Sequence, residues 1–544
     1  MHAWQQNYDP LGNLFLSSAV ALIPIVFFFL ALLVLKLKGH IACTITVLLT
    51  ALVATLFYKM PLSYALASAA YGFLYGLWPI AWIILAAVFL YKLSVKTGHF
   101  EIIRGSIVSV SDDQRIQVLL VAYGFGAFLE GAAGFGAPVA ITTALLVGLG
   151  VPPLYAGGLC LIANAAPGAF GAMGIPVIVG GQVIGAEPIA VAYNVVPSIA
   201  VLSFVLPYVL VALVDGWRGI RETWPAISVA AIVFTVTQSG TVLLIGPELP
   251  DIVASLCTLM VLPVFLKVWR PAHSFRFPAA EKEAVIVEDT YTRGEMLRAW
   301  APFIVLTVCV ALWSVPPFKK LFIGNGPLAW TVYSFPFPLL HDAVLKMPPV
   351  TAGPTPYHAI FKLDFVSSVG TAIMIAGIIS VFVLGAKVQE AGRIFVQTLK
   401  ELRIPFYSIG MVLAFAFLAN YSGLSATLAL LFADASSAFT FLSPILGWLG
   451  VFLTGSDTSS NALFGGLQAA TGHQIGVSGP LLVAANTVGG AVGKMISPQS
   501  IAVACAAIGF VGREGDLLRF TLKWSVLLVV MVGIVVTLQA YVFS

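Results

Sequence analysis

The sequence predicts an all-α, polytopic membrane protein with about 12 transmembrane helices, two re-entrant hairpins and two inverted-topology repeats. Hydrophobic residues make up 60% of the 544 residues and charged residues only 9%, against about 45–50% and about 25% in soluble proteins. The mean hydropathy is +1.00. This composition excludes an ordinary soluble enzyme, a nucleic-acid-binding protein, a disordered chain and a fibrous protein. Long apolar runs also differ from the alternating strands, about ten residues long, of a membrane β-barrel.

The predicted spans are runs of about twenty apolar residues, which cross a hydrocarbon core of about 30 Å as helix. Twelve full crossings are expected, beginning near residues 14, 40, 78, 155, 193, 225, 250, 300, 364, 404, 480 and 524. Two Gly-rich segments, at about 115–150 and 438–470, remain between these spans. Each has a stretch unfavourable to helix in its middle, so each is expected to be a re-entrant hairpin.

Basic residues orient the predicted spans, because cytoplasmic loops of membrane proteins are enriched in Lys and Arg. Lys36 and Lys38 follow the first span, so the first loop is expected in the cytoplasm and both chain ends outside. The later basic clusters, such as Lys92, Lys96, Arg104 and Arg115 in the next inside loop, fit this alternation if both hairpins return to the side they left. Lys319 and Lys320 are exceptions, since they lie in the predicted outer loop 316–360, which is Pro-rich and expected to be irregular.

An internal repeat divides the chain into related halves. The polar segment 271–296 is expected to be a cytoplasmic linker between an N-terminal half, 1–270, and a C-terminal half, 297–544. LCLIANAAPGAFGAMGIP (159–176) aligns without a gap with LLVAANTVGGAVGKMISP (481–498), and the predicted topology runs the two copies in opposite directions. Inverted repeats with helices interrupted by Gly and Pro indicate a secondary transporter. The alternative is chance similarity between Gly- and Ala-rich helices.

Non-helical backbone within a membrane must line a protein cavity, because an unpaired backbone group in lipid costs several kcal/mol. EGAAGFGAP (130–138) and GSDTSSNA (455–462) are therefore expected to be hairpin tips that meet near the midplane. Helix N-termini at such tips present free N–H groups and partial positive charge, which suit a carboxylate. Gly134 and Gly136 would allow the backbone to approach this ligand closely.

Several long motifs closely resemble the bacterial lactate permease family, which includes L-lactate and glycolate permeases. They are LEGAAGFGAPVAI, GSDTSSNALFG, ANTVGGAVGKMISPQS, GLWPIAWI and GPELPDI. The resemblance runs from WQQNYDP at residue 4 to LQAYVF near the C-terminus. It implies uptake of 2-hydroxymonocarboxylates (L-lactate, D-lactate and glycolate) by proton symport across the bacterial inner membrane. It also implies the wider ion-transporter superfamily, whose fold has two inverted halves with re-entrant hairpins.

Glu130, at the first predicted tip, is the main candidate for proton coupling. A charged side chain at the centre of a membrane helix costs about 2.5–3.5 kcal/mol on insertion scales, so such a residue is a functional candidate by default. A partly desolvated carboxyl group can accept a proton near neutral pH. The alternative is a structural carboxylate paired with a buried base.

Asp457, at the second predicted tip, is a candidate for both substrate binding and proton coupling. Its neighbours carry hydroxyl and amide groups suited to a carboxylate and a 2-hydroxyl: Ser456, Thr458, Ser459, Ser460 and Asn461. The same set could coordinate Na⁺, as in sodium-coupled relatives of the superfamily. Ser, Thr and Asp also commonly cap helices, and a cap does not exclude contact with substrate.

Lys494 is the basic residue deep in the span that begins near 480, and its repeat counterpart is Ala172. It could bind the substrate carboxylate, or neutralise Asp457 or Glu130 when no substrate is bound. A lysine that extends to the membrane surface is the other alternative. Asn164 and Asn486, at matching repeat positions, are candidate hydrogen-bond partners of the substrate or of the broken helices.

The leading hypothesis is a permease that takes up lactate and glycolate with a proton as coupling ion. A sodium-coupled or dicarboxylate carrier of the same superfold is the alternative. No ATP-binding motif, metal-ligand spacing or intramembrane catalytic constellation is present, so no enzyme activity, cofactor or metal is expected. Small 2-hydroxymonocarboxylates and membrane lipid are the expected partners, and nucleic acid is not. The sequence leaves the oligomeric state open.

Overall fold

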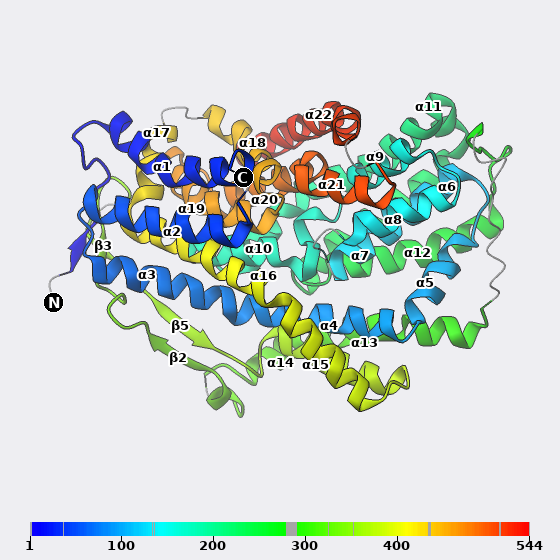
Figure 1. The fold of residues 1–544 in the computed structure, drawn as a ribbon, viewed down its shortest axis with the longest axis horizontal. Helices are drawn as coiled ribbons and strands as arrows, with labels where there is room; N and C mark the ends of the chain where they lie inside the picture. The colour runs from blue at the N-terminus through cyan, green and yellow to red at the C-terminus, as the bar shows by residue number, and fades with distance from the viewer. Residues whose placement is uncertain are drawn as a thin grey trace.

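The computed structural model describes residues 3–35, 37–132, 134, 137–278, 291–324, 326–351, 353–433, 437–510 and 513–542. Within this part of the chain, eight helices are long and apolar enough to cross a membrane, and a ninth span is counted if a pair bent by 64° is one crossing. Many of these helices run along the long axis of the molecule, and the small strands lie at the end that carries the N-terminus (Figure 1). The polytopic all-α prediction is confirmed, whereas the predicted count of 12 spans and two hairpins stays a prediction.

The first helices surround one side of the core. They are α1 (Leu14–Leu33), α2 (Gly39–Leu56), α3 (Leu62–Tyr75), η1 (Gly76–Ala81), α4 (Trp82–Lys96) and α5 (His99–Val108). The span predicted near 78 is the second part of a helical run that begins at Leu62 and is irregular at Trp78. Its first part has Ser, Tyr and Gly among its apolar residues. It is supported by packing, because Gly72 and Gly76 lie against the backbone of Leu413 and Gly410.

The predicted Gly-rich segments both form a helix, a short break and a second helix. Hairpin 1 consists of α6 (Gln114–Val118), η2 (Leu119–Phe125), α7 (Gly126–Ala132) and α8 (Ala137–Gly148). Hairpin 2 consists of α18 (Ser437–Thr454) and α19 (Asp457–Ile475). These bounds agree with the segments predicted at 115–150 and 438–470. The path of each hairpin into and out of the bilayer stays a prediction.

A broken helix follows each hairpin, which is the order expected of a repeat. After hairpin 1 come α9 (Pro153–Ala163), η3 (Gly168–Phe170) and α10 (Gly171–Ile184). After hairpin 2 come α20 (Gly479–Gly493), η6 (Lys494–Ile496) and α21 (Pro498–Ala507). We call residues 164–174 break 1 and residues 494–497 break 2.

The remaining helices complete the two halves. They are α11 (Pro188–Leu244), α12 (Pro250–Val268), α13 (Arg293–Ser314), α15 (Val369–Val383), α16 (Val388–Ser422), α17 (Leu424–Ala433) and α22 (Glu514–Tyr541). With 57 residues, α11 is far longer than one span needs. It is interrupted at Asp215 and Gly216, between the two spans that the sequence predicts. The division into halves at 271–296 stays a prediction, since residues 279–290 lie outside the described part.

The loop 316–360 is more ordered than predicted. It contains α14 (Pro316–Lys320), η5 (Ala329–Thr331), β2 (Tyr333–Pro336), β3 (Val344–Lys346) and β4 (Thr355–Pro356), and β5 (Ile360–Leu363) follows it. β2 and β5 pair antiparallel, and β3 lies between β4 and the N-terminal strand β1 (Trp4–Gln5). Strand pairing satisfies backbone groups that an irregular loop would leave to water. One of the two partners of β3, the strand β1, lies more than 300 positions away, so local sequence could not predict this pairing.

The base of hairpin 1 is fixed by a buried arginine. Arg115 binds Asp113 at 2.7 Å, Asp215 at 2.9 Å and Glu222 at 2.8 Å. Asp215 lies at the interruption in α11, so this cluster joins the hairpin base to the bend between two spans. Arg115 was expected only as a marker of a cytoplasmic loop.

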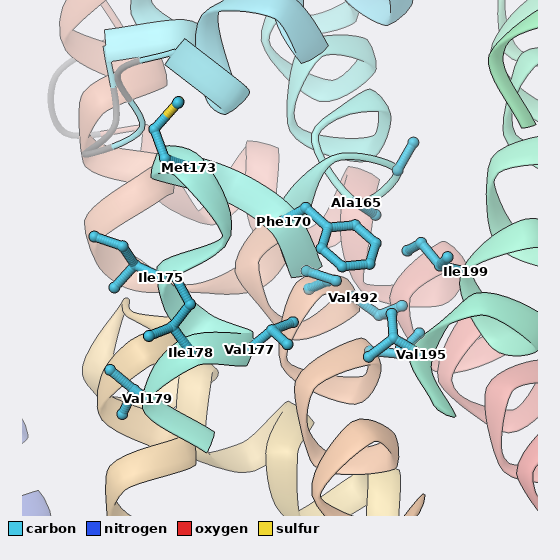
Figure 2. Close-up of a cluster of buried hydrophobic side chains, with 14 of the residues drawn as sticks. Ala165, Phe170, Met173, Ile175, Val177, Ile178, Val179, Val195, Ile199 and Val492 are labelled. Carbon is cyan, nitrogen blue, oxygen red and sulfur yellow. The ribbon is translucent and has the colours of Figure 1, made fainter. Parts of the chain in front are cut away.

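The core around break 1 is apolar and closely packed. Phe170 is directed toward Val195 and Ile199 of α11, and Val492 of α20 lies beside them (Figure 2). All four side chains are fully buried. Elsewhere small residues bring backbones together: a Cβ on Gly489 would lie 1.9 Å from the carbonyl oxygen of Pro444. Such close contacts are typical of membrane helix packing, and this one holds α18 of hairpin 2 against α20.

Candidate functional site

A central cavity of about 230 Å³ lies where both hairpin tips and both breaks meet. Much of its lining comes from the elements that the repeat predicts, including Glu130, Gly134, Gly171, Ala172, Ser456, Asp457, Thr458, Ser459, Lys494 and Gln499. Residues of the two halves thus face one another across one space. This is the geometry expected of two hairpin tips that meet in the protein interior.

Glu130 and Lys494 form an ion pair across the two halves. Glu130 lies in the last turn of α7 and is 2% exposed, while Lys494 lies at the start of break 2. Asn164 Nδ2 donates a hydrogen bond of 3.0 Å to the other carboxylate oxygen of Glu130. A Cβ on Gly171 would lie 2.6 Å from Glu130 Oε1, so a side chain at this position would displace the Glu130 carboxylate. The structure therefore has the pairing that was one of the alternatives for both charged residues.

Asp457 is buried beside this pair and lacks partners of its own. Its side chain is 5% exposed, and neither carboxylate oxygen has a hydrogen-bond partner among the described residues. It lies against Gly490, where a Cβ would approach Asp457 Oδ1 to 2.1 Å. An ionised carboxylate so deeply buried requires a donor or a cation. Asp457 is thus a group whose interactions are incomplete in the protein alone.

Ser456 is the N-cap of α19, because its Oγ accepts a hydrogen bond of 3.2 Å from Ser459 N. The capping alternative is therefore confirmed for this residue. Ser456, Thr458 and Ser459 nevertheless line the central cavity. The cap orients the first turn of α19 so that its hydroxyl groups and its N-terminus face the same space as Asp457.

Ser460, Asn461 and Asn486 belong to a buried network behind the cavity. Asn461 Nδ2 donates to Thr487 Oγ1 at 2.9 Å and to Pro176 O at 2.8 Å, and Asn486 Nδ2 donates to Asn461 Oδ1 at 2.8 Å. Ser460 Oγ donates to the Gly447 carbonyl at 3.2 Å. These contacts hold hairpin 2 against α20 and against α10, the helix that contains Pro176. They do not bring the three residues to the cavity wall.

The two repeat asparagines have different partners. Asn164 contacts Glu130 at the cavity, whereas Asn486 bonds within hairpin 2 and α20. The break falls directly after Asn164, but α20 continues for two turns beyond Asn486 before it reaches Lys494. The aligned sequences therefore share residues without sharing every helix boundary.

The glycines of the first tip are only partly described. Gly134 has a φ of +57° and lines the cavity, and a Cβ there would lie 2.9 Å from Cβ of Ala172. Gly134 thus lets tip 1 approach break 1 closely. Gly136 lies outside the described residues.

Break 1 contains a strained segment next to Glu130. Ala172, Met173 and Gly174 have φ values of 47°, 62° and 73°, in the left-handed region that few side chains adopt. In Figure 2 Met173 lies at the turn between Phe170 and Ile175. Backbone strain of this kind persists where the surroundings impose it, commonly at functional sites. Here the segment lies between Glu130, which contacts Gly171, and Pro247, whose carbonyl contacts Gly174.

Asp251 stands at the start of the span predicted near 250, and sequence reasoning missed the burial of this acid. Asp251 is in the first turn of α12 and 1% exposed. Gln238 Nε2 donates to its Oδ1 at 2.9 Å, while Oδ2 has no partner in the described part of the chain. Its Cβ packs against Gly131, the neighbour of Glu130. The acid is the second carboxyl of GPELPDI, and its signal was its position directly before the apolar run that begins at Ile252.

Two hairpins, two broken helices and a buried ion pair at their meeting point are the architecture expected of a membrane transport protein. The family model described as L-lactate permease matches residues 17–543. This chain belongs to the L-lactate permease family, and it is a permease rather than an enzyme.

Relatives support this assignment over the full length. The chain is 58% identical to the "L-lactate permease" of Escherichia coli, covering 100% of this chain and 99% of the relative. It is 56% identical to the "Glycolate permease GlcA" of Escherichia coli with the same coverage, and 46% identical to the "L-lactate permease" of Bacillus subtilis with 99% of each covered. Among solved structures, the antimetabolite efflux pump MtrF of Neisseria gonorrhoeae has a TM-score of 0.48 at 12% identity, covering 88% of this chain and 83% of MtrF.

Proposed function

We propose that this permease takes up 2-hydroxymonocarboxylates (L-lactate, D-lactate and glycolate) across the bacterial inner membrane by proton symport. Relatives named for lactate and for glycolate at similar identity support both substrates. The observation that carries proton coupling is the ion pair between Glu130 and Lys494 on the wall of the central cavity.

This ion pair couples a proton to an anion by charge balance. Removing one partner of a buried pair leaves an uncompensated charge, which costs several kcal/mol. A substrate carboxylate that takes Lys494 would leave Glu130 as such a charge unless Glu130 binds a proton. A proton on Glu130 alone would leave Lys494 unpaired. Proton and monoanion therefore bind best together, and the loaded site keeps the net charge of the free site.

The second tip supplies groups for the rest of the substrate. Asp457 carries two carboxylate oxygens without protein donors, and a 2-hydroxyl group is a donor. Thr458 and Ser459 offer hydroxyl groups beside it, and Gly134 lets backbone approach from the other tip. Lys494 would thus hold the substrate carboxylate while Asp457 recognises the hydroxyl that defines this class of acid. Ser456, Ser460, Asn461 and Asn486 act in this proposal by holding the tip, and Asn164 by orienting Glu130.

The alternative, a sodium-coupled carrier, is favoured by one observation. Asp457 and the hydroxyl groups around it are oxygen ligands of the kind that bind hard cations. A dicarboxylate carrier has less support. Two carboxylates would favour two basic groups, whereas Lys494 is the one basic residue among the described lining of the central cavity.

Competition for labelled L-lactate uptake into liposomes containing the purified protein tests the substrate class. We expect unlabelled D-lactate and glycolate to inhibit uptake, since each has one carboxylate and a 2-hydroxyl. Succinate, with a second carboxylate, and propionate, without the hydroxyl, should inhibit weakly. Equal inhibition by propionate would contradict recognition of the hydroxyl, and strong inhibition by succinate would favour the dicarboxylate alternative.

A further inference from the structure

A second, polar cavity of about 570 Å³ lies on the side of the molecule that carries the strands. We call it the strand-side cavity. Glu248, in the loop between α11 and α12, lines it together with the charged and titratable groups Glu187, Lys319, His358, Lys362 and Asp364. In the predicted topology this side is the outside of the cell. Lys319, the exception to the orientation rule, thus lies in a cavity with several acids.

Glu248 titrates in the range that matters for proton uptake. Burial raises the pKa of its carboxyl to about 6, although Lys319 and its own backbone N–H act in the opposite direction. A carboxyl with such a pKa exchanges protons readily with water that is weakly acidic. Glu248 is thus suited to collect a proton from the strand-side cavity.

Asp251 lies three positions after Glu248 and is directed into the core. Leu249 caps α12 and Pro250 begins it, so Glu248 is the loop residue before the cap and Asp251 is the second residue of the helix. Asp251 Oδ1 accepts from Gln238, which also donates to the Ala166 carbonyl in break 1 at 3.1 Å. Its Oδ2 has no acceptor or donor among the described residues. A neutral acid with its proton on Oδ2 avoids the cost of an unpaired buried charge.

The same segment touches the surroundings of Glu130. Gly131, next to Glu130, would place a Cβ 2.8 Å from Cβ of Asp251. On the other side, Pro247 O lies against Gly174 at the end of the strained segment, and Gly171, the residue before this segment, contacts Glu130. Three acids therefore follow one another from the strand-side cavity to the central cavity.

The central cavity shares no described lining residue with the strand-side cavity. Its lining includes Gly39, the first residue of α2, and Val503 of α21. Both lie toward loops that the basic residues predict to be cytoplasmic. The turn from Glu248 to Asp251 lies between the strand-side cavity, which Glu248 lines, and the surroundings of Glu130, which Asp251 contacts at Gly131.

We propose that Glu248 and Asp251 form a relay that delivers the coupling proton from the strand-side cavity to Glu130. This inference rests on the proton symport proposed above. Hydronium in the cavity protonates Glu248. Asp251 gives its Oδ2 proton to the Glu130 carboxylate and is refilled from Glu248, which returns to its ionised form. The net result is one proton moved from the cavity to Glu130, with both relay acids regenerated.

The test compares net uptake with exchange in liposomes containing the full chain. Net L-lactate uptake is followed with an internal pH dye, and exchange is followed with labelled lactate at equal internal and external pH. In D251N we expect internal acidification to slow about tenfold or more, with exchange, which needs no net proton transfer, reduced less. In D251E, which keeps a carboxyl group, we expect the ratio of net uptake to exchange to return close to the wild-type value.

E248Q and a matched control give an independent reading. We expect E248Q to lose the dependence of the net rate on external pH around pH 6, where Glu248 titrates in the wild type. E187Q, which removes another acid from the same cavity, should keep the wild-type pH profile. If D251N does not fold, the pH profile of E248Q decides.

Two results would overturn the relay, and they differ from failure of the proposed function. Wild-type pH profiles in E248Q, or an unchanged ratio of net uptake to exchange in folded D251N, would contradict it. A wild-type protein that transports lactate without internal acidification would instead contradict proton symport, and the relay would fall with it.

Discussion

Glu130 and Lys494 come from opposite halves of the chain, yet each is the other's charge partner. Both were found from sequence because a charge inside an apolar segment is expensive and therefore conspicuous. Their pairing could not be read from sequence, since it depends on how hairpin 1 and break 2 meet. Asp251 escaped for the opposite reason: at the end of a predicted helix an acid is unremarkable until its burial is known.

Neutralising Glu130 should separate exchange from accumulation. In E130Q the amide cannot take a proton, so we expect loss of accumulation driven by a pH gradient and retention of labelled-lactate exchange. Uptake into liposomes measures both. E390Q, a change of an exposed acid in the first turn of α16, is the control and should accumulate normally. Unchanged accumulation in E130Q would remove this residue from the coupling step.

The ion pair should also be visible as a stability coupling. K494M leaves Glu130 as an unpaired buried carboxylate, and we expect a loss of about 3 kcal/mol. The double variant E130Q/K494M removes both charges and should recover most of that loss, as a double-mutant cycle reports. Thermal unfolding in detergent measures the three variants against wild type. Additive losses would show that the two charges do not interact.

At the scale of elements, the sequence located the hairpins and breaks better than the helix boundaries. Gly- and Pro-rich segments inside apolar runs gave both tips, because such backbone is unfavourable in lipid. The start of the third span at Leu62 and the small sheets of the loop 316–360 were missed. Both depend on contacts with distant residues. The helix that begins at Leu62 packs against α16, and strand β3 of the loop pairs with β1.

Hairpin 2 should depend on the absence of a side chain at Gly489. In G489A the new Cβ would lie 1.9 Å from Pro444 O, so α18 and α20 must separate. Overpacking of this kind costs about 1–3 kcal/mol. G240A in α11 has no atom within 4 Å of the new Cβ and is the matched control. The midpoint of thermal unfolding should fall in G489A alone; equal midpoints would show that α18 is free to move.

At the scale of the whole molecule, both halves present the same order of hairpin and broken helix, and their meeting point forms the central cavity. Sequence predicted this order from one repeat and two tips. It did not predict the strand-side cavity, because that cavity is built from loops of both halves and from residues beyond Lys319. Glu130 lines the central cavity and Glu248 lines the strand-side cavity, and Asp251 lies between these two acids in the chain's fold.

The account as a whole requires that a pH gradient drive substrate uptake. The most direct measurement is accumulation of labelled L-lactate by the purified protein in liposomes, with an imposed pH gradient, inside alkaline, and no sodium. We predict accumulation above equilibrium that collapses when a protonophore is added. Uptake that requires sodium and ignores the protonophore would contradict proton coupling through Glu130 and would assign the coupling ion to the tip around Asp457.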